Sequence, residues 1–376
     1  MSAREPLLLA FESSCDETGV ALVTGGRRIL AQAVASQVAL HAPTGGIVPE
    51  LAARAHLRWI VPALEEVLGA AGVRVADVDG VAVTAGPGLA GSLLVGIAFA
   101  KGLAWVHDRP LVGVNHLEGH LYAAWLLDPG EVERPAPAFP LVALVASGGH
   151  TFLVEMRGHL AYRLLGETVD DAAGEAFDKA GRLLGLPYPG GPAIAAAAAE
   201  AVRRDVVLPR AWLGASFDFS FSGLKTALRR IVMADLAAAG ADPEDPSAHL
   251  PSGRVAELAW GFQESVVDVL STKTLRAAET TSARTIVLGG GVASNEALRA
   301  RLAGGARAAG VDVVVPRPGL CTDNGAMIGA AGYRRFVAGE RAGLDLDARP
   351  AWPLARPAGA PETRRPPRRR AAARAR

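Results

Sequence analysis

The stretch PLLLAFESSCDETGVALV, residues 6–23, places two apolar runs on either side of a polar, turn-rich segment. This pattern predicts a β-hairpin with strands at Pro6–Phe11 and Val20–Val23. The same pattern occurs a second time, with apolar runs at Leu141–Ala146 and Phe152–Val154 on either side of the turn Ser-Gly-Gly-His-Thr. Two similar hairpins, each opening one half of the chain, predict an internally duplicated fold.

Strand and helix patterns alternate through the rest of the chain, which favours an α/β fold with helices packed on sheets. Helices are expected at Pro49–Leu68, Leu89–Val106 and His116–Leu127, around Val255–Val269, from an N-cap at Ser294 to about Ala303, and from Thr322 to about Phe336. Further strands are expected at Val81–Val83, Leu111–Val114 and Thr285–Leu288.

The composition is that of a globular protein, with 376 residues, 50% hydrophobic and 20% charged, which is room for two domains. Cys15 and Cys321 are the only cysteines, so we expect no disulfide framework and a reducing compartment. The first apolar run is too short for a secretory signal, and no stretch reaches the length of a membrane span. We therefore expect a cytoplasmic protein that does not associate with membranes.

Charge is unevenly distributed along the chain. The formal net charge is +1, and the seven arginines between 364 and 376 account for +7, which leaves −6 for residues 1–363. The segment Ala237–Gly253 is rich in Pro, Gly and Asp, which predicts a mobile surface loop. From about Leu344 the chain shows no periodicity, so residues 344–376 are expected to form a disordered Arg/Pro/Ala-rich tail.

The strongest local motif is His116-Leu-Glu-Gly-His120, which follows an expected strand and begins a helix that Asn115 could cap. Histidines at i and i+4 share one face of a helix, and this spacing suits a single metal ion. Glu118 lies about 200° around the helix from His116. It therefore points away from the histidines, which argues against the zinc-protease motif, in which the glutamate follows the first histidine.

A two-histidine site needs a further ligand, and Asp323 in Cys-Thr-Asp-Asn-Gly is the best candidate. A carboxylate from a distant segment would complete a His2Asp site with positions left open for substrate or water. The alternative is that Asp323 only caps the closing helix. Cys321 is interpreted as a buried structural thiol.

Glycine-rich segments form the second class of motif. Gly86-Pro-Gly88-Leu-Ala-Gly91 matches the dinucleotide fingerprint. However, the expected acid does not end the next strand, so a nicotinamide oxidoreductase is a weak alternative. Clusters at Ser147–Gly149, Tyr188–Pro192 and Gly289–Asn295 suit the walls of a nucleotide site, because glycine lets backbone N–H groups approach phosphate. Four acids on a predicted helix could bind ribose or form a solvated face: Asp170, Asp171, Glu175 and Asp178.

Together these motifs resemble the tRNA N6-adenosine threonylcarbamoyltransferases, the TsaD family. The matching stretches are ESSCDETGVA, TGGIVPELAARAH, TAGPGLAGSLLVG, GVNHLEGHLYA, ASGGHT, LLGETVDDAAGEAFDKAGRLLGLPYPGGP, DFSFSGLKTAL, GGGVASN and CTDNGAMIG. They run in order from about residue 8 to about residue 335, so the resemblance covers most of the chain.

The resemblance implies an α/β, actin/Hsp70-like (ASKHA) fold of two duplicated lobes with the active site in the cleft between them. The implied lobes are residues 1–115, completed by the closing helix at about 322–340, and residues 116–321. The implied reaction transfers a threonylcarbamoyl group from threonylcarbamoyl-AMP to the N6 amine of adenosine-37. It acts on tRNAs that read codons beginning with adenine and yields N6-threonylcarbamoyladenosine (t6A) and AMP.

Carried over residue by residue, the resemblance implies that His116, His120 and Asp323 hold one divalent metal ion, Fe²⁺ first and Zn²⁺ as the alternative. The implied adenylate-binding residues are Val145, Ala146, Ser147, Gly148, Gly149, Asp178, Gly191 and Asn295. Asp16 and Glu17, in the first hairpin turn, are candidate catalytic residues. Some relatives carry an acid where this chain has Ala195, which leaves one ribose contact open.

The expected partners are tRNA, a TsaB-type paralogue of the same fold and a TsaE-type ATPase. A small-molecule kinase or a nucleotide-binding scaffold of the same fold would share the glycine turns. Neither needs a His-x3-His pair joined by a distant aspartate, so the three expected ligands separate the transferase from these alternatives.

Overall fold

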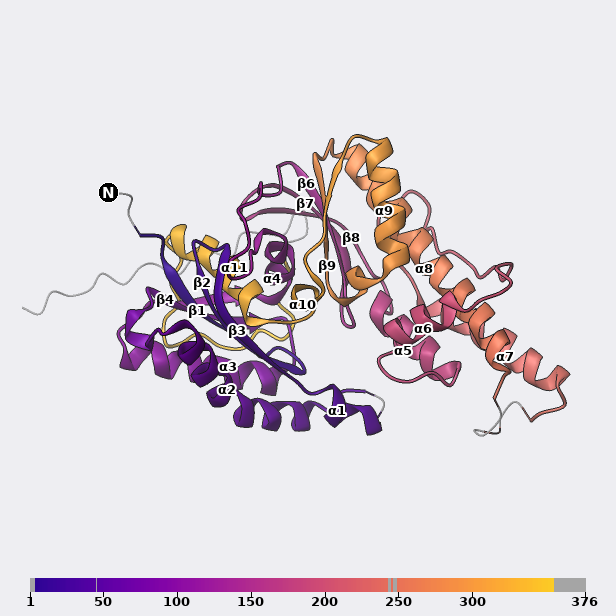
Figure 1. The fold of residues 1–376 in the computed structure, drawn as a ribbon, viewed down its shortest axis with the longest axis horizontal. Coiled ribbons are helices and arrows are strands. Elements are labelled where there is room, and N and C mark those ends of the chain that lie inside the picture. The colour runs from indigo at the N-terminus through magenta and orange to yellow at the C-terminus, as the bar shows by residue number, and fades with distance from the viewer. Residues whose placement is uncertain (1–3, 45, 243–244, 246–248, 355–376) are drawn as a thin grey trace, which may run out of the picture.

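The computed structural model describes residues 4–44, 46–242, 245 and 249–354, and these form two five-stranded sheets with helices around and between them (Figure 1). The strands are β1 (Leu7–Glu12), β2 (Glu17–Thr24), β3 (Arg28–Ser36), β4 (Gly80–Gly86), β5 (Leu111–Asn115), β6 (Leu141–Ala146), β7 (Thr151–Gly158), β8 (Ala161–Glu167), β9 (Thr285–Gly289) and β10 (Asp312–Val314).

The second sheet repeats the topology of the first strand by strand. The first sheet has the order β3-β2-β1-β4-β5 and the second has the equivalent order β8-β7-β6-β9-β10. In each sheet the first three strands are antiparallel neighbours, and the fourth strand lies parallel to the first. The internal duplication predicted from the two hairpins is therefore confirmed.

The α-helices are α1 (Val38–His41), α2 (Pro49–Ala71), α3 (Ala90–Val106), α4 (His116–Tyr122), α5 (Ala173–Leu183), α6 (Gly190–Ala199), α7 (Ser222–Ala238), α8 (Ser252–Thr280), α9 (Glu296–Ala308), α10 (Pro318–Cys321) and α11 (Gly325–Val337). Short 3-10 turns are η1 (Ala42–Thr44), η2 (Val75–Asp77), η3 (Ala123–Trp125) and η4 (Gly291–Ser294). In the described ranges, no helix is both long and apolar enough for a bilayer span.

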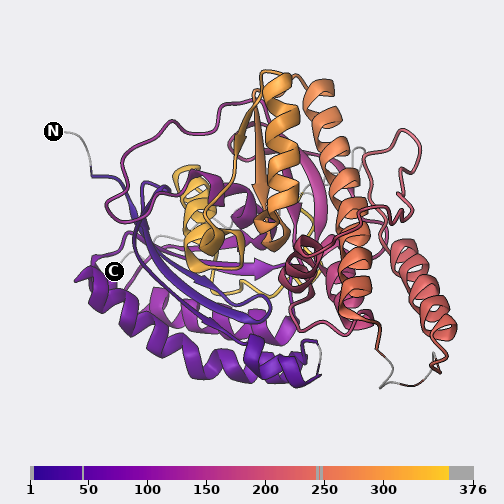
Figure 2. The ribbon, with the colours of Figure 1, turned by 45° about the vertical axis from the view of Figure 1, so that its right-hand side comes forward.

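Each sheet has an outer helical layer. Helices α2 and α3 lie along one face of the first sheet, where Leu9 and Phe11 of β1 pack against Ile60 and Leu93. Helices α8 and α9 lie side by side along the second sheet (Figure 2), and α5, α6 and α7 pack against α8. Because both faces of the strands are covered, β1 and β6 are buried at every position, and their sequences are continuous apolar runs rather than alternating ones.

Helices α4 and α11 form a central layer that is shared by the two sheets. One hydrophobic cluster joins Val114 of the first sheet and Val145 of the second to Leu121 of α4 and Met327 of α11. Helix α4 thus lies where the two halves meet, and α11 packs against it. This arrangement brings segments that are about 200 residues apart in sequence together at the centre of the molecule.

Three predicted element boundaries were wrong, and at two of them a different side chain from the expected one caps the helix. The helix expected to reach Leu127 ends at Tyr122 and continues as η3. Asn295, and not Ser294, caps α9. The closing helix begins at Gly325 behind the N-cap Asn324, and not at Thr322.

The prediction of disorder from Leu344 is wrong for residues 344–354. Residues 341–354, hereafter the C-terminal strap, run along the first sheet, where Ala342 N donates to Leu111 O at 2.8 Å and Arg349 N donates to Ala85 O at 2.7 Å. Leu346 and Trp352 pack against the core under α2 and α3. Backbone bonds and isolated apolar side chains hold this segment, so it lacks the periodicity that predicts structure.

Two other predictions concern segments that the structure describes only in part. The remainder of the predicted tail, residues 355–376, lies outside the described residues. The predicted surface loop Ala237–Gly253 overlaps the ends of α7 and α8, and its residues 243–244 and 246–248 also lie outside them.

Candidate functional site

The predicted metal-binding histidines lie on α4, which begins directly at the end of β5. Asn115 ends the strand, and its side-chain oxygen accepts from Leu117 N at 2.9 Å, which caps the helix as expected. His116 and His120 are one turn apart and almost fully buried. Their ring centroids are 4.7 Å apart and the ring planes are nearly perpendicular, so the two imidazoles meet edge to face.

Asp323 completes the cluster from the segment between α10 and α11. Its Oδ1 lies 3.5 Å from His116 Nε2 and 3.1 Å from His120 Nε2. One ligand atom from each of the three residues falls within 4.8 Å of the others. Asn324, and not Asp323, caps α11, since its Oδ1 accepts from Met327 N at 2.8 Å. The structure therefore brings the three predicted ligands together and removes the capping alternative for Asp323.

The donor set fits a divalent metal ion. Within the part of the chain that the structure describes, both ring nitrogens of His120 are buried without a hydrogen-bond partner. The 3.1 Å approach of Nε2 to Asp323 lacks hydrogen-bond alignment, as expected where both atoms face a common third point. Buried polar atoms without partners are costly. Two imidazoles and one carboxylate are ligands that suit Zn²⁺ and Fe²⁺ and leave positions open.

The local charge also favours a cation. Burial by itself would raise the pKa of the Asp323 carboxyl, but attraction from His116 and His120 outweighs it and lowers that pKa below its ordinary value. Burial opposes protonation of His116, yet the Asp323 and Glu12 carboxylates raise its pKa to about 9. An ionised carboxylate pair around the imidazoles therefore favours a positive charge at this position.

Sequence reasoning missed Glu12, which ends β1 and holds His116 in place. Its Oε2 lies 3.0 Å from His116 Nδ1 and accepts from Thr84 Oγ1 at 2.6 Å. Its Oε1 accepts from Ser14 N at 2.5 Å. A carboxylate on one imidazole nitrogen fixes the tautomer that leaves Nε2 for a metal. The available signal was an acid directly after a buried strand, in the same turn as the catalytic candidates.

The glycine turn of the second hairpin lies beside the histidines. Ser147 N donates to His150 O at 2.7 Å, which closes the turn. Gly148 and Gly149 are exposed, and a Cβ added to either would meet no atom within 4 Å. The ring centroid of His150, a second residue that sequence reasoning missed, is 6.2 Å from that of His116. The exposed glycine turn thus lies close to the three expected metal ligands.

The other predicted adenylate residues differ in how they are held. Val145 and Ala146 are buried in β6. Asp178 Oδ1 accepts from Gly190 N at 2.7 Å at the start of α6, and Asn295 caps α9. Gly191 has open space around it. Asp178 and Asn295 therefore have structural partners already.

The acids near Asp178 have structural partners too. Helix α5 begins at Ala173, so Asp170 and Asp171 precede the helix on which they were expected. Asp170 Oδ1 instead accepts from Phe221 N at 2.8 Å, and its Oδ2 accepts from the hydroxyls of Ser220 and Ser222 at the start of α7. Asp171 pairs with Lys179 at 2.6 Å. These partners make Asp170 and Asp171 parts of the scaffold.

Asp16 lies in the first hairpin turn, and Glu17 is the first residue of β2. Burial, followed by the charges of Asp323 and Asp16, raises the pKa of Glu17 to about 10. Burial is also the main cause that raises the pKa of Asp178, and the Asp16 carboxylate adds to that shift. Asp16 is therefore within electrostatic reach of a second-half residue, as expected for a position facing the junction of the two halves.

The dinucleotide-like glycines at Gly86–Gly91 contact protein backbone. A Cβ on Gly88 would lie 2.6 Å from Ser14 O, and one on Gly86 would lie 1.9 Å from Arg349 O. Gly88 N donates to Pro350 O at 3.2 Å. These glycines allow the first hairpin turn and the C-terminal strap to approach, which removes the basis for the oxidoreductase alternative.

Comparison with known proteins gives a consistent result. The family model "TsaD: tRNA N6-adenosine threonylcarbamoyltransferase" matches residues 28–330. The chain is 54% identical to the tRNA N6-adenosine threonylcarbamoyltransferase of Thermomicrobium roseum over 356 residues, 93% of this chain and 97% of that protein. It is 50% identical to the protein of the same name from Symbiobacterium thermophilum over 346 residues, 92% of this chain and 96% of that protein.

Solved structures support the fold. HypF from T. kodakarensis matches with a TM-score of 0.57 at 13% identity, over 89% of this chain and 49% of that chain. A likeness at this identity shows the fold alone, and with the duplicated sheets it establishes the actin/Hsp70-like (ASKHA) architecture. With a family model over most of its length and relatives at half identity, the chain belongs to the TsaD family of tRNA N6-adenosine threonylcarbamoyltransferases.

Proposed function

We propose that this chain transfers the threonylcarbamoyl group of threonylcarbamoyl-AMP to the N6 amine of adenosine-37 in tRNAs that read codons beginning with adenine. The products are t6A and AMP. The observation that carries the proposal is the cluster of His116, His120 and Asp323 beside the open glycine turn at Gly148 and Gly149. A kinase or scaffold of the same fold has no use for such a donor set.

In this proposal His116, His120 and Asp323 hold one divalent ion, Fe²⁺ or Zn²⁺. When bound, the ion supplies Lewis acidity toward an oxygen of the acyl donor. Glu12 holds the His116 imidazole so that Nε2 faces the site. The backbone N–H groups of Gly148 and Gly149 receive the adenylate phosphate, because a turn of successive amides binds anions well.

The reaction replaces one single bond to the carbamoyl carbon with another. The adenosine N6 nitrogen forms a bond to the carbamoyl carbon, the bond from that carbon to the phosphate oxygen breaks, and AMP leaves with the electron pair. The proton lost from N6 passes to solvent or to a carboxylate. Asp16 and Glu17, beside the first hairpin turn, are the proposed catalytic residues. The pKa of Glu17 is raised to about 10, so this side chain keeps its proton at neutral pH and does not accept the proton from N6. An unchanged transfer rate in Asp16→Asn would remove Asp16 from this role.

The proposal includes a TsaB-type paralogue on the outer face of α2 and α3, a TsaE-type ATPase, and tRNA. The two helices lie side by side in Figure 1, and each of them exposes large apolar side chains. The most exposed are Leu57 at 65%, Trp105 at 72% and Val106 at 74%. A partner of the same fold would cover these side chains and complete the assembly.

A transfer assay tests the function. Purified protein, with the TsaB-type and TsaE-type partners supplied, is mixed with labelled threonylcarbamoyl-AMP and an unmodified tRNA that reads an A-starting codon. We expect label in the tRNA from wild type, and a loss of at least about 1000-fold in the His116→Ala/His120→Ala variant, since a bound Lewis acid contributes several kcal/mol. No transfer by folded wild type would contradict the proposal.

A further inference from the structure

Helix α4 has a second face, opposite its histidines, that is tied to α11. Glu118 is 1% exposed, and both of its carboxylate oxygens are bound by Arg335. Arg335 Nε donates to Oε2 at 2.6 Å and Nη2 donates to Oε1 at 2.6 Å. A two-pronged pair of this kind fixes the relative orientation of the two side chains as well as their distance.

The residue after Glu118 lets the two helices come close. A Cβ on Gly119 would lie 2.9 Å from Ile328 Cδ1 and 3.0 Å from Met327 Cγ, both on α11. Any side chain at this position would push α4 away. Within His-Leu-Glu-Gly-His, the two histidines therefore face the metal cluster while the Glu-Gly pair faces α11.

Helix α11 thus helps to position both Asp323 and the helix that carries the two histidines. Asp323 stands two residues before its first turn, and Asn324 caps that turn. Arg335, near the other end of α11, holds the helix that carries the histidines. A seven-residue helix such as α4 is too short to be stable by itself. Its rotation about its own axis must therefore be set by contacts of this kind.

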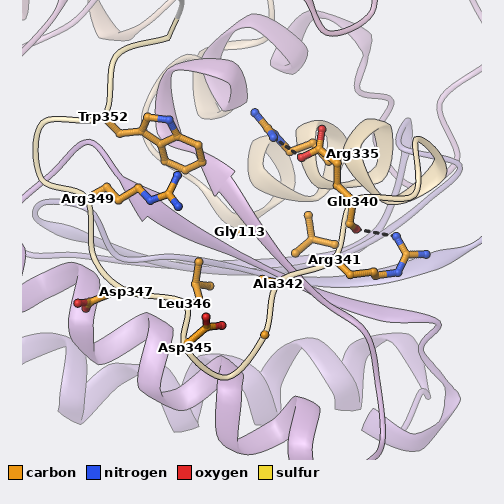
Figure 3. Close-up of a pocket in the computed structure, with 12 residues that line it drawn as sticks. Gly113, Arg335, Glu340, Arg341, Ala342, Asp345, Leu346, Asp347, Arg349 and Trp352 are labelled. Carbon is orange, nitrogen blue, oxygen red and sulfur yellow. Dashed lines mark hydrogen bonds and ion pairs between the residues drawn. The ribbon is translucent and has the colours of Figure 1, made fainter. Parts of the chain in front are cut away.

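The C-terminal strap covers the same contact from outside. The Arg335 guanidinium lies 5.6 Å from the centroid of the Trp352 ring, and Arg335 Nη1 donates to the exposed Glu340 at 2.5 Å. Figure 3 shows Arg335, Glu340 and Trp352 on the wall of one cavity of about 330 Å³. Asn115, the cap of α4, donates to Trp352 O at 3.2 Å.

We infer that Glu118 is a positioning residue: through Arg335 it sets the rotation of α4 so that His116 and His120 meet Asp323. This inference rests on the proposed metal site and adds residues that do not themselves touch the metal. A buried ion pair contributes little net stability, because desolvation offsets the attraction. Orientation of the histidines gives a reason for this charge to be buried here.

The test is Co²⁺ binding to metal-free full-length protein, followed by visible absorption. Arg335 has two carboxylate partners, so Glu118→Gln and Glu340→Gln each remove one negative charge from the same guanidinium. We expect Glu118→Gln to weaken Co²⁺ binding by about 10- to 100-fold, the usual effect of outer residues that orient ligands. Glu340→Gln should stay within about 2-fold, because its side chain is 46% exposed. Equal affinity of Glu118→Gln and wild type would overturn the inference.

A double variant separates positioning from stability. Glu118→Leu/Arg335→Met removes both charges, so thermal stability should return toward wild type without an unpaired buried charge. Co²⁺ affinity should stay low if the ion pair orients α4. Recovery of affinity together with stability would overturn the inference. Wild type that binds no Co²⁺, or binds it as His116→Ala/His120→Ala does, would instead overturn the proposed metal site itself.

Discussion

The two halves of the molecule share one scaffold but carry different chemistry at equivalent positions. Glu12, Asp16 and Glu17 lie at the ends of the first hairpin's strands and in its turn, whereas the second hairpin's turn contains Gly148 and Gly149. An acidic turn suits a cation or an imidazole, and a glycine turn suits a phosphate. The two hairpins thus share one topology but present different side chains at their turns.

The three expected metal ligands follow the fifth strand of each sheet in chain order. His116 and His120 follow β5, and Asp323 follows β10 and the short helix α10. The helices next to these ligands, α4 and α11, pack against each other between the sheets. The cluster therefore exists only when both halves are correctly joined, which places the proposed chemistry at the junction.

The largest expected effect is the loss of stability when a glycine after the fourth strand of either sheet is replaced. In both halves this glycine lies against the backbone of a neighbouring segment. A Cβ on Gly290 would lie 2.3 Å from Ala146 O, and φ there is +80°. One on Gly88 would lie 2.6 Å from Ser14 O. We expect Gly290→Ala and Gly88→Ala to lose about 2–4 kcal/mol each, measured as a lower Tm, because backbone atoms cannot yield.

The turn glycines provide the contrast. Gly149→Ala meets open space, so its Tm should stay near that of wild type. A raised KM for threonylcarbamoyl-AMP at unchanged stability would support a phosphate at this turn. If Gly290→Ala were as stable as Gly149→Ala, the close approach of β9 to β6 would not limit this fold.

The second largest effect should distinguish two buried glutamates, one from each half. Glu12 contacts His116, whereas Glu155 pairs with Arg157 and Arg163 at 2.8 and 2.5 Å. Glu12→Gln should weaken Co²⁺ binding by about 10- to 100-fold, since it removes the carboxylate that orients an imidazole. Glu155→Gln is the matched control and should bind Co²⁺ as wild type does. Similar losses in both variants would mean that general destabilisation, and not orientation, lowers the affinity.

The order of residue types along the chain predicted the features of the two halves that depend on local sequence. Two apolar runs around a turn predicted each hairpin, and the i, i+4 spacing predicted that His116 and His120 share a face. Partners chosen by tertiary contact could not be predicted this way. Nothing local to Glu12 or Glu118 indicates that their partners are 104 and 217 residues away.

Helix boundaries that depend on a single capping side chain could not be predicted from the pattern of residue types either. Ser294 and Asn295 are both good caps, and so are Thr322 and Asn324, so only the backbone conformation decides between them. The C-terminal strap is held by backbone hydrogen bonds to β4 and β5. Backbone hydrogen bonds do not depend on the side chains, so the amino-acid composition does not predict them.

A third effect concerns the outer surfaces of the two halves. Helices α2 and α3 expose several large apolar side chains, while in the described residues α8 and α9 expose none. We expect Trp105→Glu to weaken binding of the TsaB-type paralogue by about 10- to 100-fold, as loss of a buried interface aromatic does. Ala308→Glu on α9 is the control and should bind normally. Pairing measured by analytical ultracentrifugation that is unchanged in Trp105→Glu would place the partner elsewhere.

The smallest effect should come from the arginine-rich residues 355–376, and the structure shows where a truncation must be made. The described chain ends at Leu354, just after strap residues that bind Asn115. A stop after Leu354 removes eight arginines and keeps the strap. If those arginines bind tRNA phosphates, affinity at low salt falls several-fold, and the salt slope falls by about 0.7–0.9 for each phosphate that is no longer neutralised.

A stop after Glu340 removes the strap as well, so it should also weaken Co²⁺ binding by freeing Asn115 and uncovering Arg335. Comparing the two truncations therefore assigns each effect to its own segment. An unchanged salt slope after the first truncation would leave the tail without a role in tRNA binding. Co²⁺ affinity that survives the second would show that Glu118 and Arg335 hold α4 without help from the strap.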